Sequence, residues 1–91
     1  MKRNLKQWST VFKGLGNPNR LHILKILTAR KQVSVSALAE ELGISLKNTS
    51  RNLAILSNLD LIQYQGKRDH VYYSINPNID SDIQKILNLS V

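Results

Sequence analysis

The chain has 91 residues, is 42% hydrophobic and 21% charged, and contains no cysteine. A chain of this length forms one domain with a modest core, so residues 1–91 are expected to be a single domain. Without cysteine there is no disulfide framework, no thiolate metal site and no thiol catalysis. No apolar run is long enough to span a membrane, and the basic N-terminus lacks the apolar stretch of a secretory signal, so we expect a cytoplasmic protein.

The charge of the chain is strongly basic and unevenly distributed. Thirteen Lys and Arg residues against six Asp and Glu residues give a formal net charge of +7. Residues 1–31 hold eight of the basic residues and no acidic one. This balance favours a polyanionic partner such as nucleic acid, although a solvated basic surface would give the same charge.

The first predicted helix, over residues 1–15, carries one apolar stripe whose members recur at steps of three and four residues. The stripe consists of Leu5, Trp8, Phe12 and Leu15. A second helix is expected to begin with Asn17 as its N-cap and Pro18 in its first turn. It runs to about Ala29 and is apolar on several sides, so we expect it at the centre of the core.

Apolar and polar residues alternate over Val-Ser-Val at residues 33–35, which predicts a minimal strand. Ser36 is expected to cap a third helix, and the Gly-Ile-Ser turn at residues 43–45 to end that helix and cap a fourth, which reaches about Asn58. The apolar positions of the fourth helix are Leu46, Thr49, Leu53, Leu56 and Leu59. A short helix, a three-residue turn and a longer helix over residues 36–58 form a helix-turn-helix.

The outer face of the fourth helix is rich in short hydrogen-bonding and cationic side chains. Side chains of these types read base edges or hold phosphates in a DNA major groove. The residues that we expect to contact DNA here are Ser45, Lys47, Asn48, Ser50, Arg51 and Asn52. The alternative interpretation is an ordinary solvated helix in an αα-hairpin.

After this helix the apolar residues recur at every second position and no longer at helical spacing, which predicts a β-hairpin. The alternating residues of its two strands are Ile62 and Tyr64, then Val71, Tyr73 and Ile75. The turn is expected over residues 65–69, with Gly66-Lys67-Arg68 at its tip. We expect Lys67 and Arg68 to contact the DNA backbone; in a rival interpretation, the Arg68 guanidinium enters a narrow A·T-rich minor groove. Charged hairpin tips also occur simply because they are solvated.

A last amphipathic helix is predicted over residues 78–90, with Ile79, Ile83, Ile86 and Leu87 as its apolar positions. A helix-turn-helix followed by such a hairpin is the layout of a winged helix. The two terminal helices carry more apolar surface than a winged helix of 91 residues can bury within one chain. We therefore predict that residues 1–15 and 78–90 build a two-fold dimer. Its interface would contain Leu5, Trp8, Phe12, Leu15, Ile79, Ile83, Ile86 and Leu87. Alternatively, both stripes only cover the core of a monomer.

Four segments match the motifs of one family in both order and spacing. They are FKGLGNPNRLHIL at residues 12–24, VSALAEELGIS at residues 35–45, SRNLAIL at residues 50–56 and GKRDHVYYSI at residues 66–75. Together they resemble the ArsR/SmtB family of winged-helix transcriptional repressors. The resemblance implies a homodimer that binds a palindromic DNA operator and represses transcription.

The chain departs from the metal-sensing pattern of that family. Residues 33–35 are Val-Ser-Val where metal-sensing members carry a Cys-Val-Cys type of motif. The last helix offers Asp80 and Asp82, but carboxylates two residues apart point to different faces and chelate poorly. A lone histidine is more often structural or exposed than a metal ligand, and His22 and His70 are interpreted in this way. We expect no metal site and no cofactor.

The sequence therefore predicts a mainly α (α+β) winged helix-turn-helix with five helices and a β-hairpin wing. Its expected function is that of a DNA-binding transcriptional regulator, a homodimeric repressor without the metal-sensing sites of the family. The alternative is a winged-helix module for protein interaction, or an accessory factor with weak DNA affinity. An enzyme is not expected, because no paired carboxylates, Ser/His/Asp set or phosphate-binding Gly loop is present. The sequence identifies no effector and no membrane partner.

Overall fold

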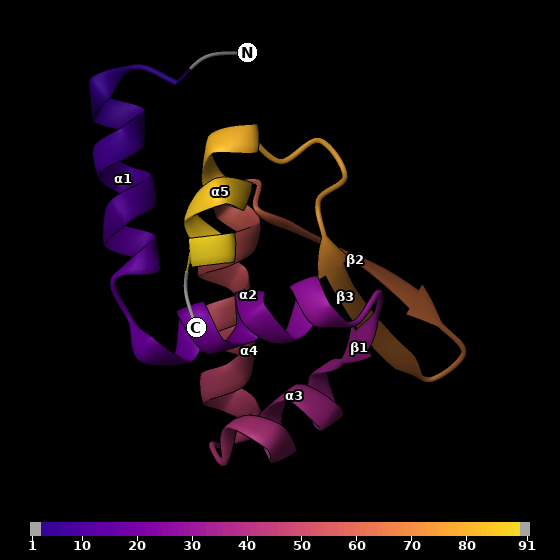
Figure 1. The fold of residues 1–91 in the computed structure, drawn as a ribbon. Coiled ribbons are helices and arrows are strands. Elements are labelled where there is room, and N and C mark those ends of the chain that lie inside the picture. The colour runs from indigo at the N-terminus through magenta and orange to yellow at the C-terminus, as the bar shows by residue number, and fades with distance from the viewer. Residues whose placement is uncertain (1–2, 90–91) are drawn as a thin grey trace.

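The computed structural model describes residues 3–89 (Figure 1). The helices of this range are α1 (Leu5–Leu15), α2 (Pro18–Ala29), α3 (Val35–Leu42), α4 (Leu46–Asn58) and α5 (Ser81–Leu89), and the strands are β1 (Val33–Ser34), β2 (Ile62–Lys67) and β3 (His70–Ile75). This order confirms the predicted five-helix winged helix-turn-helix. The last helix begins three residues later than predicted, so Ile79 precedes it, and residues 1, 2 and 90 of the predicted terminal helices lie outside the described residues.

The three strands form one antiparallel sheet in the order β1-β3-β2. The hairpin β2–β3 projects from the helices as the wing (Figure 1). At its base Ile62 pairs with Ile75, and Val33 of β1 pairs with Tyr73 on the other edge of β3. The short strand just before the helix-turn-helix therefore fixes the base of the wing to that motif.

The helix boundaries follow from side-chain caps. Asn17 accepts hydrogen bonds from the backbone amides of the first turn of α2, as its Asn-Pro sequence predicts. Ser45 caps α4 through the amide of Asn48, and Gly43 ends α3 in the left-handed conformation with φ of 69°. The predicted cap of α3 is wrong: Ser34 and not Ser36 accepts the hydrogen bond from the Ala37 amide, so the helix begins earlier.

The core lies around α2 and receives side chains from every helix. Its fully or almost fully buried apolar members are Val11, Leu15, Ile23, Leu24, Ile26, Leu27, Val33, Leu38, Leu53, Leu56, Leu61, Ile62, Ile83 and Leu87. Three of these, Leu15, Ile83 and Leu87, were predicted to line the dimer interface. They are at most 5% exposed within the single chain, so they stabilise the protomer and offer no surface to a partner.

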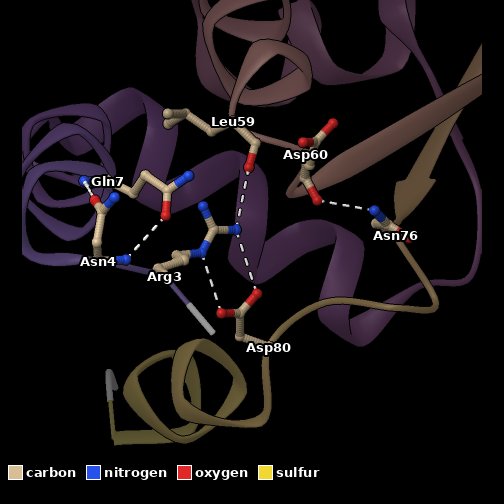
Figure 2. A network of polar contacts seen from close by, with 7 residues as sticks. All are labelled: Arg3, Asn4, Gln7, Leu59, Asp60, Asn76 and Asp80. Carbon is tan, nitrogen blue, oxygen red and sulfur yellow. Dashed lines mark hydrogen bonds and ion pairs between the residues drawn. The ribbon is translucent and has the colours of Figure 1, made fainter. Parts of the chain in front are cut away.

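An ion pair fixes the segment before α1 to the far end of the chain (Figure 2). The Arg3 guanidinium donates to both carboxylate oxygens of Asp80, at 3.1 and 3.2 Å, and to the Leu59 carbonyl oxygen at 3.3 Å. The hydrogen bonds from Arg3 hold the pKa of Asp80 below its usual value. The Asp80 side chain thus holds the residue before α5 to the N-terminal segment through Arg3, which also reaches the Leu59 residue that follows α4.

Helix α1 stands at one edge of the molecule (Figure 1), and Gly14 near its C-terminal end closely approaches the side chain of Leu59, the residue that follows α4. Gly14 allows this approach, because a Cβ there would overlap the Leu59 side chain. None of the helices within residues 3–89 is long and apolar enough to cross a membrane.

Candidate nucleic-acid interface

The second helix of the helix-turn-helix, α4, has one buried side and one solvent side. Thr49, Leu53 and Leu56 are completely buried. The Thr49 hydroxyl is satisfied because it donates to the Ser45 carbonyl oxygen at 2.8 Å, one turn back. The predicted inward face is thus correct from Thr49 onward, and the opposite face is available to a ligand.

Four of the predicted DNA contacts are exposed on or beside this solvent face: Lys47, Asn48, Ser50 and Arg51. Lys47 and Arg51 lie four residues apart, so both project from the same side of the helix. Within residues 3–89 neither side chain has a hydrogen bond or an ion pair. Their charges are therefore not neutralised by the protein and are free to act on an anion.

The other two predicted contacts on α4 are used inside the protein. The Ser45 hydroxyl oxygen accepts from the Asn48 amide at 3.0 Å as the helix cap. Asn52 is half-buried; its side-chain oxygen accepts from Arg20 at 2.9 Å and its amide nitrogen donates to the Asn48 carbonyl oxygen at 3.0 Å. The side chain of Asn52 thus connects α4 to Arg20 of α2 and to the preceding turn of α4. The sequence reasoning missed this structural role.

Arg20 is a further residue that the sequence reasoning missed. Its Nε donates to the carbonyl oxygen of Gly14 near the end of α1, while Nη1 donates to Asn52 on α4. The half-buried guanidinium of Arg20 on α2 therefore joins α2 to both α1 and α4. In the sequence Arg20 was one of eight cations in a basic segment, and only its place in the Asn-Pro-x-Arg motif set it apart.

The tip of the wing differs from the prediction. Gly66 pairs with Val71 and Lys67 with His70, so the strands continue further and the turn consists of Arg68 and Asp69 alone. Arg68 adopts φ of 56°, the left-handed conformation that such a turn requires. Lys67 and Arg68 remain exposed, as predicted.

One face of the wing is hollowed beside these cations. The hollow, of about 550 Å³, is lined by Gln32, Lys67, Arg68, Asp69, His70 and Tyr72. The Lys67 ammonium donates to the Gln32 side-chain oxygen at 3.2 Å. Because Gln32 is neutral, this hydrogen bond orients the ammonium without cancelling its charge.

No three potential metal ligands gather among the residues that the structure describes. His22 is exposed on α2, and His70 is exposed on the wing, where its ring meets that of Tyr72 edge-on with centroids 6.1 Å apart.

Large apolar side chains are exposed on α1 and at the start of α4. On α1, Leu5 is 89% and Phe12 is 54% exposed, and the Phe12 ring stacks on that of Trp8 with centroids 5.7 Å apart. On α4, Leu46 is 57% exposed. The expectation that Leu46 faces inward is therefore wrong, since the buried side of the helix begins one turn later.

A family model described as "Helix-turn-helix domain" matches residues 15–65. The chain is 31% identical over 74 residues to the transcriptional repressor SdpR of Bacillus subtilis, covering 81% of each protein. It is 33% identical over 73 residues to a "Transcriptional repressor SmtB homolog" of Synechocystis, covering 80% of this chain but 54% of that protein, so it spans about half of that relative.

Among solved structures, the fold is similar to a DNA-binding domain of Mycobacterium bovis determined by NMR. That domain is described as a homodimeric winged helix-turn-helix of a possible ArsR-family regulator. The TM-score is 0.78 at 29% sequence identity, over 98% of this chain and 85% of that one.

Proposed function

Because the chain belongs to the ArsR/SmtB-type helix-turn-helix regulators, we propose that it represses transcription as a homodimer bound to double-stranded DNA. The relatives that are 31% and 33% identical to it are described as transcriptional repressors, and we propose no catalytic activity. A regulator of this kind must reach the DNA, so we assign it to the cytoplasm. No metal centre and no cofactor are part of the proposal.

The observation that carries the proposal is the solvent face of α4. Lys47, Ser50 and Arg51 are exposed there, and neither cation is paired within residues 3–89. The N-terminal half of a recognition helix is the part that reaches base edges in the major groove. Arg and Lys recognise guanine, Asn recognises adenine, and Ser bonds to more than one base, so this face has the chemistry for sequence recognition.

The wing supplies the second contact in this proposal. Lys67 and Arg68 project at the tip of the hairpin, and Gln32 orients the Lys67 ammonium. Cations on such a hairpin suit phosphate oxygens, which position a protein on DNA without reading its sequence. The wing therefore contributes affinity and register, and α4 contributes specificity.

The dimer in this proposal is formed mainly through α1. Leu5 and Phe12 are exposed and Trp8 is half-buried, three or four residues apart along one side of the helix. Ile79 and Ile86, both half-buried, complete the reduced interface. A two-fold dimer would present its recognition helices about 34 Å apart, which is one turn of DNA.

Selection of bound sequences from random duplex DNA tests the function, with Arg51→Ala as the first variant. We expect a palindromic site, and the variant should lose about 1–3 kcal/mol of binding free energy and relax the preference at one position in each half-site. Lys85→Ala, on the exposed side of α5, is the matched control and should bind as the wild type does. Enrichment of no sequence would refute the proposal and favour a protein-interaction module.

A further inference from the structure

Leu46 is the first residue of α4, directly after the Ser45 cap. Its side chain is 57% exposed, whereas Thr49, three residues further along, is completely buried. This end of α4 lies beside α3 at the bottom of Figure 1. The core thus makes little use of Leu46, although leucine is among the most frequently buried residue types.

Helix formation does not explain a leucine at this position either. The first turn of a helix favours acidic or small polar residues, because its free amides and the helix dipole interact with negative charge and hydrogen-bond acceptors. The Ser45 hydroxyl already provides the cap. A polar residue at position 46 would serve folding at least as well.

Leu46 lies at the edge of the candidate base-reading face. Exposed Ser50 lies four residues on and buried Thr49 three residues on, so Leu46 stands between the polar face and the buried side of the helix. Under the proposed function, Leu46 is a large exposed apolar side chain at the border of the surface that meets base edges.

The major groove offers one apolar group for such a side chain. The C5-methyl group of thymine is the only methyl that the four bases present there, and apolar side chains recognise it by contact. Leucine has no hydrogen-bonding group, so it gains nothing from the polar edges of the other bases. Burial of a methyl against a leucine removes apolar surface of both from water.

We propose that Leu46 reads a thymine methyl group in each half-site of the DNA operator. The inference rests on the proposed function and adds to it a base that the bound DNA must contain. It also implies a preference for DNA that carries thymine over the same duplex with uracil, since uracil differs from thymine only in lacking this methyl group.

Replacing thymine by deoxyuridine tests the inference directly. The full chain is titrated with the tightest duplex selected from random DNA, and each thymine of the half-site is changed to deoxyuridine in turn. We expect one position per half-site at which the change weakens binding about fourfold, and about fifteenfold when both half-sites carry it. All hydrogen-bonding groups of the duplex stay in place.

Variants of the protein then assign the methyl contact to its residue. Leu46→Ala should bind the thymine and deoxyuridine duplexes equally at that position, and Leu46→Met should keep most of the preference because it keeps the apolar volume. Ile55→Ala is the matched control: Ile55 is 39% exposed on the same helix, nine residues further from its N-terminus. That variant should keep the full thymine preference.

The outcomes separate the two proposals. Selective DNA binding without any methyl effect, or a methyl effect that persists unchanged in Leu46→Ala, would overturn the role of Leu46 and leave the proposed function standing. Binding that is equal for all duplexes would overturn both. A methyl effect lost in Leu46→Ala and retained in Ile55→Ala would support the inference.

Discussion

Replacing Arg20 by alanine should weaken the attachment of the recognition helix to the rest of the protein. The side chain donates to the Gly14 carbonyl oxygen near the end of α1 and to Asn52 on α4. Its removal deletes both hydrogen bonds and leaves two acceptors at a half-buried junction without their partner. The change therefore affects α1, α2 and α4 together.

The size of the effect follows from these two bonds. Hydrogen bonds to a charged group contribute about 1.5–3 kcal/mol each when buried. Arg20 is half-buried, so we take the lower end and expect a loss of about 2–3 kcal/mol. For a domain of this size each kcal/mol corresponds to about 4–8 °C in the melting temperature, so Arg20→Ala should melt about 10–20 °C lower.

A double-mutant cycle with Asn52→Ala isolates the contact between the two side chains. Unfolding in urea gives the free energies of the two single variants and the double variant, at one protomer concentration because dimer formation would shift the midpoint. We expect a coupling energy of about 1 kcal/mol. Arg20→Lys is the conservative control and should be intermediate, since an ammonium lacks the fork that reaches both acceptors. Additivity of the two single variants within about 0.3–0.5 kcal/mol would refute the bridge.

Three further predictions concern the wing, the dimer and the ion pair. Changing Lys67 and Arg68 together to Ala should flatten the slope of log affinity against log salt by about 1.8 per wing, with little change in sequence preference; an unchanged slope would mean that the wing does not touch phosphates. Phe12→Asp should convert a dimer into a monomer in light scattering at micromolar concentration, and a dimer that survives the change would exclude α1 from the interface. Asp80→Asn should cost about 1 kcal/mol of unfolding free energy at pH 7. Since Arg3 lowers the folded pKa of Asp80, this difference should be complete above pH 5 and shrink as the pH falls through the folded pKa, below the usual 3.8; a difference independent of pH would contradict the ion pair.

The helices were predictable because their ends carry local signals. Asn17 before Pro18, Gly43 at the end of α3 and Ser45 before α4 act through backbone atoms at most four residues away. Such interactions are visible in the sequence itself. The cap of α3 was misjudged because residues 34 and 36 are both serines, and the pairing of the first with β3 decides between them.

The turn of the wing depends on interactions across the sheet. The glycine at position 66 looked like a turn residue, but a Cβ there would meet nothing within 4 Å, so the position needs no glycine. The register is set at the base of the hairpin, where Ile62 faces Ile75 and the rings of Tyr64 and Tyr73 lie 5.5 Å apart. Counting outward from these pairs leaves only Arg68 and Asp69 for the turn.

The spacing of apolar residues also could not predict which of them are buried in the core and which are exposed. A stripe tells which side of a helix is apolar, but one stripe can serve the core and a partner at once. On α1 the core takes Val11 and Leu15 and leaves Leu5 and Phe12 exposed. Only the packing of α1 against α2 and the rest of the core distinguishes the two sets.

Residue Ser34 is both the last residue of β1 and the N-cap of α3, so strand and helix follow each other with no linker. One residue inserted at this junction would rotate the start of the helix by about 100° and break either the strand pairing or the cap. The two-residue turn of the wing belongs to no second structural element, and loop tips tolerate added length well. Evolution of this chain is thus expected to vary the reach of the wing by insertion and to change the junction at Ser34 by substitution alone.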